Sequence, residues 1–85
     1  MTHIVQLTKH AEKSLAKIAK RDGERIRIAL RVLENNPYPP AARKLVNRNQ
    51  WRVRVGKYRI IYEVFDDELI VLVISIGHRS NVYDA

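Results

Sequence analysis

Cysteine is absent from this sequence, and glycine is scarce. The missing cysteines exclude disulfides, thiolate nucleophiles and cysteine-based zinc sites, and they fit a reducing compartment. The 3 glycines stand singly, so no glycine-rich loop is available to cradle a phosphate. The 3 histidines lack the spacing of metal ligands, and the acidic residues form no carboxylate set. We therefore expect neither a metal nor a cofactor.

Long hydrophobic runs are also missing. The longest one, residues 69–74, has the length of a strand, whereas a membrane span needs about 20 residues. The first residues, Met1 to Gln6, lack the charged region and the apolar block of a secretory signal. Together these features predict a cytoplasmic protein without a membrane partner.

Negative charge is in short supply. The 16 lysines and arginines stand against 9 aspartates and glutamates, which gives a formal net charge of +7 in a chain of 85 residues. Such a balance favours polyanionic partners, either nucleic acid or an acidic protein. The length suits one compact domain, and 46% hydrophobic residues is typical of a globular one. We expect residues 1–85 to form a single domain.

Apolar spacing in the first half of the sequence is helical. Residues 3–7 alternate as a short strand, and Thr8 is suited to cap a helix over residues 9–21. Asp22-Gly23 interrupts that helix, and a second one follows over residues 24–35 until a proline stops it. The pattern predicts an N-terminal strand followed by a helical hairpin.

Spacing in the second half changes to alternation. The proline-rich segment 37–42 predicts an ordered loop. Strands are predicted over residues 51–55, 58–65 and 69–76, joined by turns at Gly56-Lys57 and Asp66-Asp67. Consecutive hairpins indicate an antiparallel β-meander. The predicted fold class is therefore α+β, with the helices packed on one face of the sheet.

Ile28 and Val32 lie beside the predicted core stripe of the second helix, among arginines. The simpler interpretation is that they widen the apolar stripe that faces the core. The alternative is a docking surface for a helix of a partner.

A basic stretch coincides with the loop and the first predicted hairpin. No acidic residue occurs between Glu34 and Glu63, whereas seven basic residues do. They are Arg43, Lys44, Arg48, Arg52, Arg54, Lys57 and Arg59. Positive charge therefore accumulates there without neutralisation by sequence neighbours.

A two-residue turn at Gly56-Lys57 would fix how this hairpin pairs. Arg54 then lies directly opposite Arg59, and both share one sheet face with Arg52. The apolar face toward the helices would consist of Val53, Val55, Ile60 and Tyr62. The sequence thus predicts one basic face and one apolar face.

Directly opposed like charges destabilise a sheet, so the pair of Arg54 and Arg59 indicates an anionic ligand. Arginine presents fixed donors that suit phosphate oxygens, and it keeps its charge at any relevant pH. Such a cluster can clamp an RNA backbone and stabilise charge on a reacting phosphate. The alternative is a solvated basic face that is paired with Glu63 or Asp84.

The end of the sequence carries further groups suited to RNA chemistry, namely His78, Arg79 and Tyr83. Cleavage without a metal needs a group that takes the ribose 2′-OH proton, a group that protonates the leaving 5′ oxygen, and cations around the phosphorane. His78 and Tyr83 are proton-handling types, and Arg79 is a cation. A surface histidine is more often a bystander, and Tyr83 equally suits stacking on a base or anchoring the tail.

These residues also carry a resemblance to the RelE/ParE toxin superfamily, and to RelE toxins more than to ParE toxins. It lies in Trp51-Arg-Val-Arg-Val-Gly-Lys-Tyr-Arg-Ile-Ile-Tyr-Glu-Val, Asp66-Asp67, Val71-Leu-Val-Ile-Ser-Ile-Gly-His-Arg and Val82-Tyr83. The resemblance spans nearly the whole chain. It implies the toxin of a type II toxin–antitoxin pair, a ribosome-dependent, metal-independent endoribonuclease that cuts mRNA and thereby inhibits translation and growth.

The resemblance also implies roles for single residues. Arg52 and Arg54 would orient the substrate, Arg59 and Arg79 would stabilise the transition-state phosphate, and Tyr83 or His78 would transfer the proton. Lysines are common in the family at the first two positions, and arginines there favour phosphate stabilisation over proton abstraction. Contacts to RNA or the ribosome are expected from Arg43, Lys44, Arg48 and Lys57.

The implied partners are a cognate antitoxin with an acidic or amphipathic segment, the ribosome and mRNA, and operator DNA through the antitoxin only. Two other interpretations stay open. One is a ParE-like inhibitor of DNA gyrase on the same fold, against which the arginine cluster and Tyr83 argue. The other is a non-catalytic RNA- or DNA-binding module that uses the basic sheet face alone.

Overall fold

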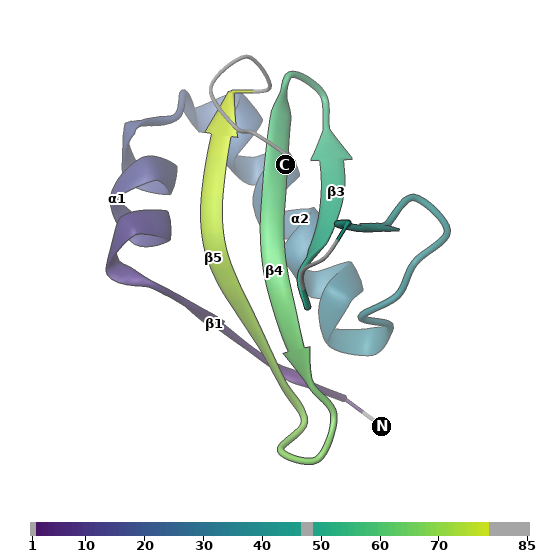
Figure 1. The fold of residues 1–85 in the computed structure, drawn as a ribbon. Coiled ribbons are helices and arrows are strands. Elements are labelled where there is room, and N and C mark those ends of the chain that lie inside the picture. Colours follow the sequence, from purple (N-terminus) through teal and green to yellow (C-terminus); the bar gives the residue numbers. More distant parts are fainter. Residues whose placement is uncertain (1, 47–48, 79–85) are drawn as a thin grey trace.

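The computed structural model describes residues 2–46 and 49–78 of the chain. The elements follow in the order β1 (Ile4–Leu7), α1 (Lys9–Lys17), α2 (Lys20–Asn35), β2 (Arg43–Lys44), β3 (Trp51–Val55), β4 (Tyr58–Phe65) and β5 (Ile70–His78). Figure 1 shows α2 behind β3 and β4 and α1 alongside β5, and both helices share one core with the sheet. The predicted α+β class is confirmed.

The strands of the described residues form one sheet in the order β1-β5-β4-β3-β2. β3, β4 and β5 form the antiparallel meander that the sequence predicts, and β2 adds to it antiparallel to β3. β1 pairs in parallel with β5, where Ile4 is the partner of Ile70. The first strand of the chain therefore lies against the last one, as Figure 1 shows.

Thr8 caps α1 as predicted. Its backbone is extended, with φ −65° and ψ 162°, and its side-chain oxygen accepts a hydrogen bond of 3.1 Å from the Ala11 amide. Its hydroxyl also donates to the Ile74 carbonyl at 2.8 Å. A cap of this kind satisfies one of the free amides at a helix start. Thr8 thus fixes the start of α1 against β5.

The predicted helix break at Asp22-Gly23 is wrong, because the chain leaves the helical conformation earlier. Ile18 has ψ 140° and Ala19 has ψ 146°, and α2 begins directly after them. Gly23 is buried inside α2, and its amide donates to the Ala19 carbonyl at 2.8 Å. A Cβ atom at Gly23 would lie 3.2 Å from Nη1 of Arg27. Glycine therefore allows close packing there and does not end a helix.

The hydrophobic core lies between the helices and one face of the sheet. Its helical part is Ala11, Ile26, Leu30 and Leu33, and its strand part includes Val53, Ile60, Tyr62, Val71, Val73 and Ile76. Ile28 and Val32 are exposed, so the prediction that they widen the core stripe is wrong. At about 100° per residue, they lie on the opposite side of α2 from Ile26.

β5 changes its alternation at Ile74. Tyr62 of β4 pairs with Val73, whereas Ile61 pairs with Ser75, so Ile74 is an extra residue in β5. Such a bulge shifts the side-chain phase by one position. It explains why the buried residues of β5 are Val71, Val73 and Ile76. The predicted apolar strand is present, but the residues between these positions are only half-buried.

Among the described residues, no helix is long and apolar enough to cross a membrane.

Candidate nucleic-acid interface

The β3–β4 hairpin pairs as the sequence predicts. Arg54 is the partner of Arg59, and Arg52 is the partner of Ile61. The turn between the strands contains Gly56, whose φ of +57° is the left-handed conformation that glycine adopts without strain. Because the turn has two residues, it fixes the register of both strands.

The two faces of this hairpin separate as predicted. Val53, Ile60 and Tyr62 are buried in the core, on the helix-covered side. The side chains at alternate positions point to the other side of the sheet, which we call the open face. There Arg54 is exposed, and Arg52 and Arg59 are half-buried. The structure therefore brings these three arginines together on one surface.

The open face includes a fourth arginine. Arg43 of β2 is the Cα partner of Arg52, so the two side chains share a face. Nη1 of Arg43 donates to the carbonyls of Pro40 and Ala42 at 2.8 and 2.9 Å. These bonds hold its guanidinium beside the proline-rich loop. The sequence placed Arg43 among the general RNA contacts, because a strand of two residues gives no alternation to read.

A hollow adjoins this end of the open face. It has a volume of about 230 Å³ and is lined by Arg43, Lys44, Leu45, Val46 and Arg52. Lys44 is the Cα partner of Trp51, one position along the sheet from the pair of Arg43 and Arg52. Lys57 is exposed in the β3–β4 turn. The basic residues thus extend from the turn to the β2 edge.

Of the other predicted site residues, His78 lies in a row on the other side of the sheet from the arginines. His78 is the Cα partner of Tyr58, in the row that includes Val55 on the helix-covered side. Its ring lies edge-on to the Tyr58 ring, with the centroids 5.8 Å apart. Arg48, Arg79 and Tyr83, with the predicted counter-ion Asp84, lie outside the described residues.

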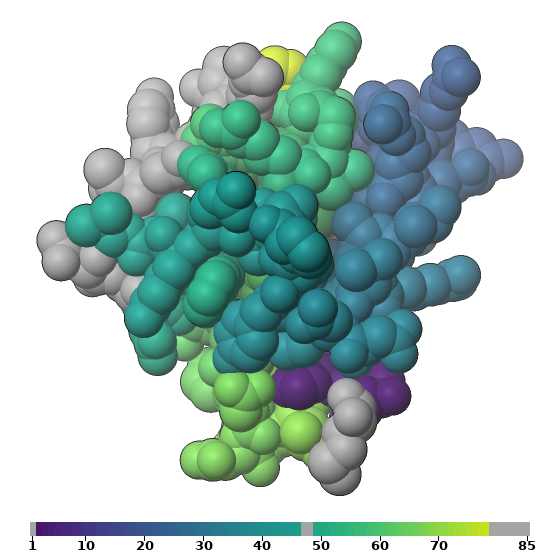
Figure 2. Space-filling model, turned by 90° about the vertical axis from the view of Figure 1, so that its right-hand side faces the viewer, coloured from purple at the N-terminus to yellow at the C-terminus, as the bar shows by residue number. Residues whose placement is uncertain are grey.

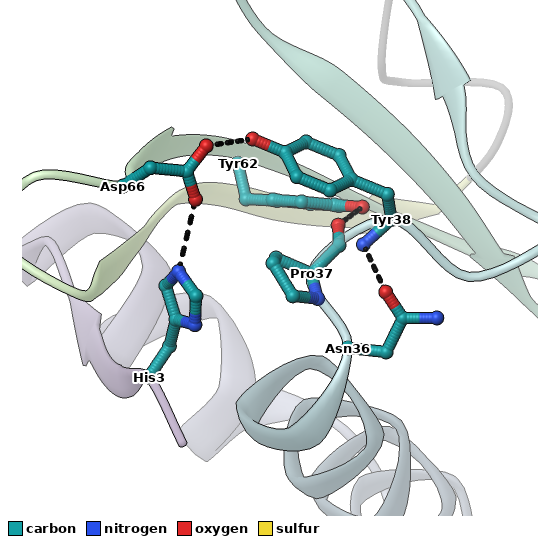
Figure 3. A network of polar contacts seen from close by, with 6 residues as sticks. All are labelled: His3, Asn36, Pro37, Tyr38, Tyr62 and Asp66. Atoms are coloured by element: carbon teal, nitrogen blue, oxygen red, sulfur yellow. Dashed lines mark hydrogen bonds and ion pairs between the residues drawn. The ribbon is translucent and has the colours of Figure 1, made fainter. Parts of the chain in front are cut away.

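A polar network that the sequence did not reveal joins distant segments at the opposite end of β4 (Figure 3). Nε2 of His3 lies 3.0 Å from Oδ1 of Asp66, and the Tyr38 hydroxyl donates to Oδ2 of Asp66 at 2.7 Å. Beside them the buried Tyr62 hydroxyl donates to the Pro37 carbonyl at 2.7 Å. The network ties the N-terminal segment and the loop after α2 to the β4–β5 turn.

The ionisation of these groups follows from their contacts. The hydrogen bonds from Tyr38 and His3 lower the pKa of Asp66. Burial, together with the hydrogen bond to Asp66, raises the pKa of Tyr38 to about 12. Burial also raises the pKa of Tyr62, and the nearby Tyr38 adds to this shift. The carboxylate is thus held ionised and both hydroxyls protonated, which suits a structural role.

Within residues 2–46 and 49–78, no three or more His, Cys, Asp or Glu side chains come together in a way that could hold a metal ion.

Known proteins resemble this chain over nearly its whole length. The family model described as ParE toxin of type II toxin-antitoxin system, parDE, matches residues 5–83. The chain belongs to the RelE/ParE toxin superfamily. This membership confirms the resemblance seen in the hairpin and in β5.

Individual RelE/ParE relatives agree with this result. A protein of Escherichia coli named as a RelE-like toxin is 28% identical over 88 residues, which cover 99% of this chain and 93% of that protein. A protein of Methanocaldococcus jannaschii named as toxin RelE1 is 26% identical over 83 residues, 93% of this chain and 92% of that protein.

Among solved structures, a chain of the archaeal RelE–RelB complex from Pyrococcus horikoshii superposes with a TM-score of 0.84 at 26% identity. The match covers 96% of this chain and 100% of that one. The two-layer arrangement and the order of elements described above are therefore those of a RelE toxin.

Proposed function

We propose that this superfamily member is a ribosome-dependent endoribonuclease that cleaves mRNA without a metal and so inhibits translation and growth. The observation that carries the proposal is the pairing of Arg54 with Arg59 beside Arg52 on the open face. Guanidinium groups gathered on one surface suit the oxygens of a phosphate, which they bind through paired N–H donors. The relatives named as RelE toxins support the toxin part of the proposal.

The arginines suit the charge that develops during cleavage. Attack of the ribose 2′-OH on the adjacent phosphorus forms a phosphorane and releases a 5′-OH, which leaves a 2′,3′-cyclic phosphate. In this scheme Arg52 and Arg54 orient the phosphate, and Arg59 with Arg79 stabilises the added negative charge. Arginines are poor bases, so the proton is taken by another group.

Proton transfer is assigned to Tyr83, with His78 as the second choice. His78 is exposed, but it lies on the side of the sheet away from the arginines, which argues against it because a base must reach the proton that it abstracts. A Tyr83→Phe variant should lose cleavage and keep RNA binding, whereas His78→Gln should keep both. The opposite pattern in single-turnover cleavage would exchange the two assignments.

The proposed partners follow from the charge and from the relatives. A cognate antitoxin is expected, since the Pyrococcus horikoshii relative was solved in a complex with RelB. An acidic or amphipathic segment of it would neutralise the basic face, and operator DNA would be bound through the antitoxin only. The proposed substrate is mRNA bound to the ribosome. Further contacts to this RNA would come from Arg43, Lys44, Arg48 and Lys57.

End-mapping of mRNA after brief expression tests the proposal. We expect cuts in phase with the reading frame when ribosomes are present, and their loss in Arg59→Gln. Arg21→Gln is the matched control, because it removes the same charge from the exposed surface of α2. Absence of cuts with the unmodified protein would refute the activity, and RNA binding without cleavage would favour a non-catalytic module.

A second candidate is inhibition of DNA gyrase, which the ParE description of the matching family model favours. A supercoiling assay with purified gyrase separates the two. Blocked supercoiling together with intact mRNA in a translation reaction would establish the ParE-like function in place of the nuclease.

A further inference from the structure

The two edges of the sheet differ in how they are protected against pairing with another strand. β1 and β2 are the outer strands of the sheet that the described residues form. Proteins protect such edges with charges, prolines or a very short strand, because an edge offers its N–H and C=O groups to other chains. The β2 edge has all of these features: Arg43-Lys44 is two residues long, and Pro39 and Pro40 precede it. Figure 2 shows the chain that leads into β2, in dark teal, spread over this side of the molecule.

The β1 edge has little of this protection. Its four residues, Ile4-Val5-Gln6-Leu7, contain neither a charge nor a proline, and they pair with β5 without a shift of register. Figure 1 shows β1 beyond β5, on the side of the sheet away from β2. The Ile4 side chain is 61% exposed, and Gln6 is exposed as well. This edge is therefore suited to accept a further strand.

The hydrogen bonds of β1 show which of its peptide groups are directed outward. The Ile4 amide donates to the Leu69 carbonyl at 2.7 Å, toward the β5 side. Peptide groups alternate in direction along a strand, so Val5 and Leu7 direct their N–H and C=O groups away from β5. The His3 amide, which is also directed outward, donates to a carbonyl in the last turn of α2 at 2.8 Å. The outward groups that remain for another strand therefore begin at Val5.

We propose that β1 pairs antiparallel with β1 of a second copy of this chain, about a two-fold axis that passes through Gln6. In this register Val5 lies opposite Leu7 of the second copy, and each such pair exchanges two N–H···O bonds. The outward groups of both residues are thereby satisfied, and the two sheets join into one. A short edge makes a small interface, so the dimer should form only as the protein concentration rises.

Charges at the two ends of β1 favour this antiparallel orientation. Asp67 and Glu68 are exposed in the turn that leads into β5, next to the first residue of β1. Lys9 is exposed at the start of α1, just after the other end of β1. The two-fold axis brings the acidic end of each copy toward the basic end of the other, whereas a parallel pairing would bring like ends together. RNA does not suit this edge, because β1 has no cation to contact a phosphate.

The arginines of the open face do not oppose the dimer. Arg54 and Arg59 lie on β3 and β4, and β5 separates β4 from β1. Neighbouring strands lie about 4.8 Å apart, so the β4 strands of the two copies would be five spacings, about 24 Å, apart. Exposed charges are largely screened beyond about 8 Å at physiological salt. The inference goes beyond the proposed function, because the dimer requires neither cleavage nor RNA.

Cysteine cross-linking tests the proposed register, since the sequence contains no cysteine of its own. The two Gln6 residues would face each other across the axis as a non-hydrogen-bonded pair, with Cα atoms about 4.5 Å apart, a distance that a disulfide spans. Gln6→Cys should therefore form a disulfide-linked dimer under mild oxidation. Ile4→Cys is the matched control on the same face of β1. Its two copies would be displaced by four residues, about 13 Å, along the strands, so it should cross-link about tenfold more slowly.

Sedimentation equilibrium of the unmodified protein tests the dimer itself. The mass should rise from that of one copy to that of two as the concentration increases. Val5→Pro should raise the dissociation constant about tenfold, because it removes an outward N–H group of each copy from the contact. That N–H group does not pair with β5, so the monomer should keep its fold, which circular dichroism would verify. Gln6→Lys places like charges opposite each other at an exposed position and should weaken the dimer up to about fivefold, which gives a second test if Val5→Pro unfolds.

Three results would overturn the inference. They are a monomer at every concentration, equal cross-linking rates of Gln6→Cys and Ile4→Cys, and a dimer that neither Val5→Pro nor Gln6→Lys weakens. A monomer whose β1 edge binds an extended peptide of unrelated sequence would assign the edge to a different protein. None of these readouts uses RNA, so failure of the dimer and failure of the proposed nuclease are distinguishable.

Discussion

Replacing Arg54 with glutamine should stabilise the free protein while it weakens RNA binding. Arg54 and Arg59 are directly opposed on β3 and β4, where Cβ atoms lie about 4.5–5.5 Å apart. A like-charge pair in this position costs roughly 0.2–1 kcal/mol. Since about 1 kcal/mol shifts Tm by 4–8 °C in a domain of this size, we expect a rise of about 1–8 °C.

Thermal unfolding at low and high salt is the assay for the stability half of this prediction. The gain should shrink toward zero near 1 M salt, because exposed charges are then screened within about 3 Å. Arg54→Lys keeps the charge and should leave Tm unchanged. Arg31→Gln lowers the net charge equally but removes an exposed arginine of α2, so it controls for long-range repulsion.

The predicted loss of RNA affinity in Arg54→Gln is measured by titrating a single-stranded RNA at several salt concentrations. Loss of one phosphate contact should reduce the slope of log K against log salt by about 0.7. The reasoning is refuted if Tm falls in Arg54→Gln, or if Arg31→Gln raises Tm by the same amount. Either result would mean that the opposed pair is not a source of strain.

Three further predictions concern the scaffold. Tyr62→Phe leaves the Pro37 carbonyl without its hydrogen bond and should cost about 1–3 kcal/mol in urea unfolding; an unchanged midpoint would contradict the role of that bond. The contacts of Asp66 lower its pKa in the folded protein, so the ionised carboxylate stabilises the fold above the ordinary carboxyl pKa. This stabilisation is lost as the pH falls through the folded pKa. Asp66→Asn should therefore make Tm depend less on pH in the acid range. Gly23→Ala should stabilise the protein by up to about 1 kcal/mol, because only the flexible end of the Arg27 side chain must move. Gly56→Ala should destabilise it by about 1 kcal/mol or more, because Gly56 has φ +57°. Thermal unfolding that shifts Tm in the same direction for both variants would contradict this.

The arginine site was predictable where local rules fix geometry. A two-residue turn determines the register of a hairpin, and alternation then determines the faces, so Arg54 opposite Arg59 followed from sequence spacing alone. The cap at Thr8 has a similarly local cause. In each case the interacting groups are only a few residues apart.

Features that depend on distant residues were not predictable. The hydrogen bond between His3 and Asp66 joins residues 63 positions apart, and the parallel pairing of Ile4 with Ile70 has no local signal. The helix junction was misplaced for a related reason. Asp22-Gly23 has the composition of a helix end, but Gly23 is buried inside α2, and this burial depends on how the helix packs in the fold.

The open face changes character along β4, and this bears on where a phosphate would lie. Arg59 is near the turn to β3, whereas at the other end Phe65 is in register with Ile70, and Ile70 with Ile4. Six residues of strand separate the two ends, about 20 Å. Glu63 lies on the same face between Ile61 and Phe65, so negative charge begins toward the middle of β4. A phosphate bound as proposed would therefore lie at the end near the β3–β4 turn, where the arginines are.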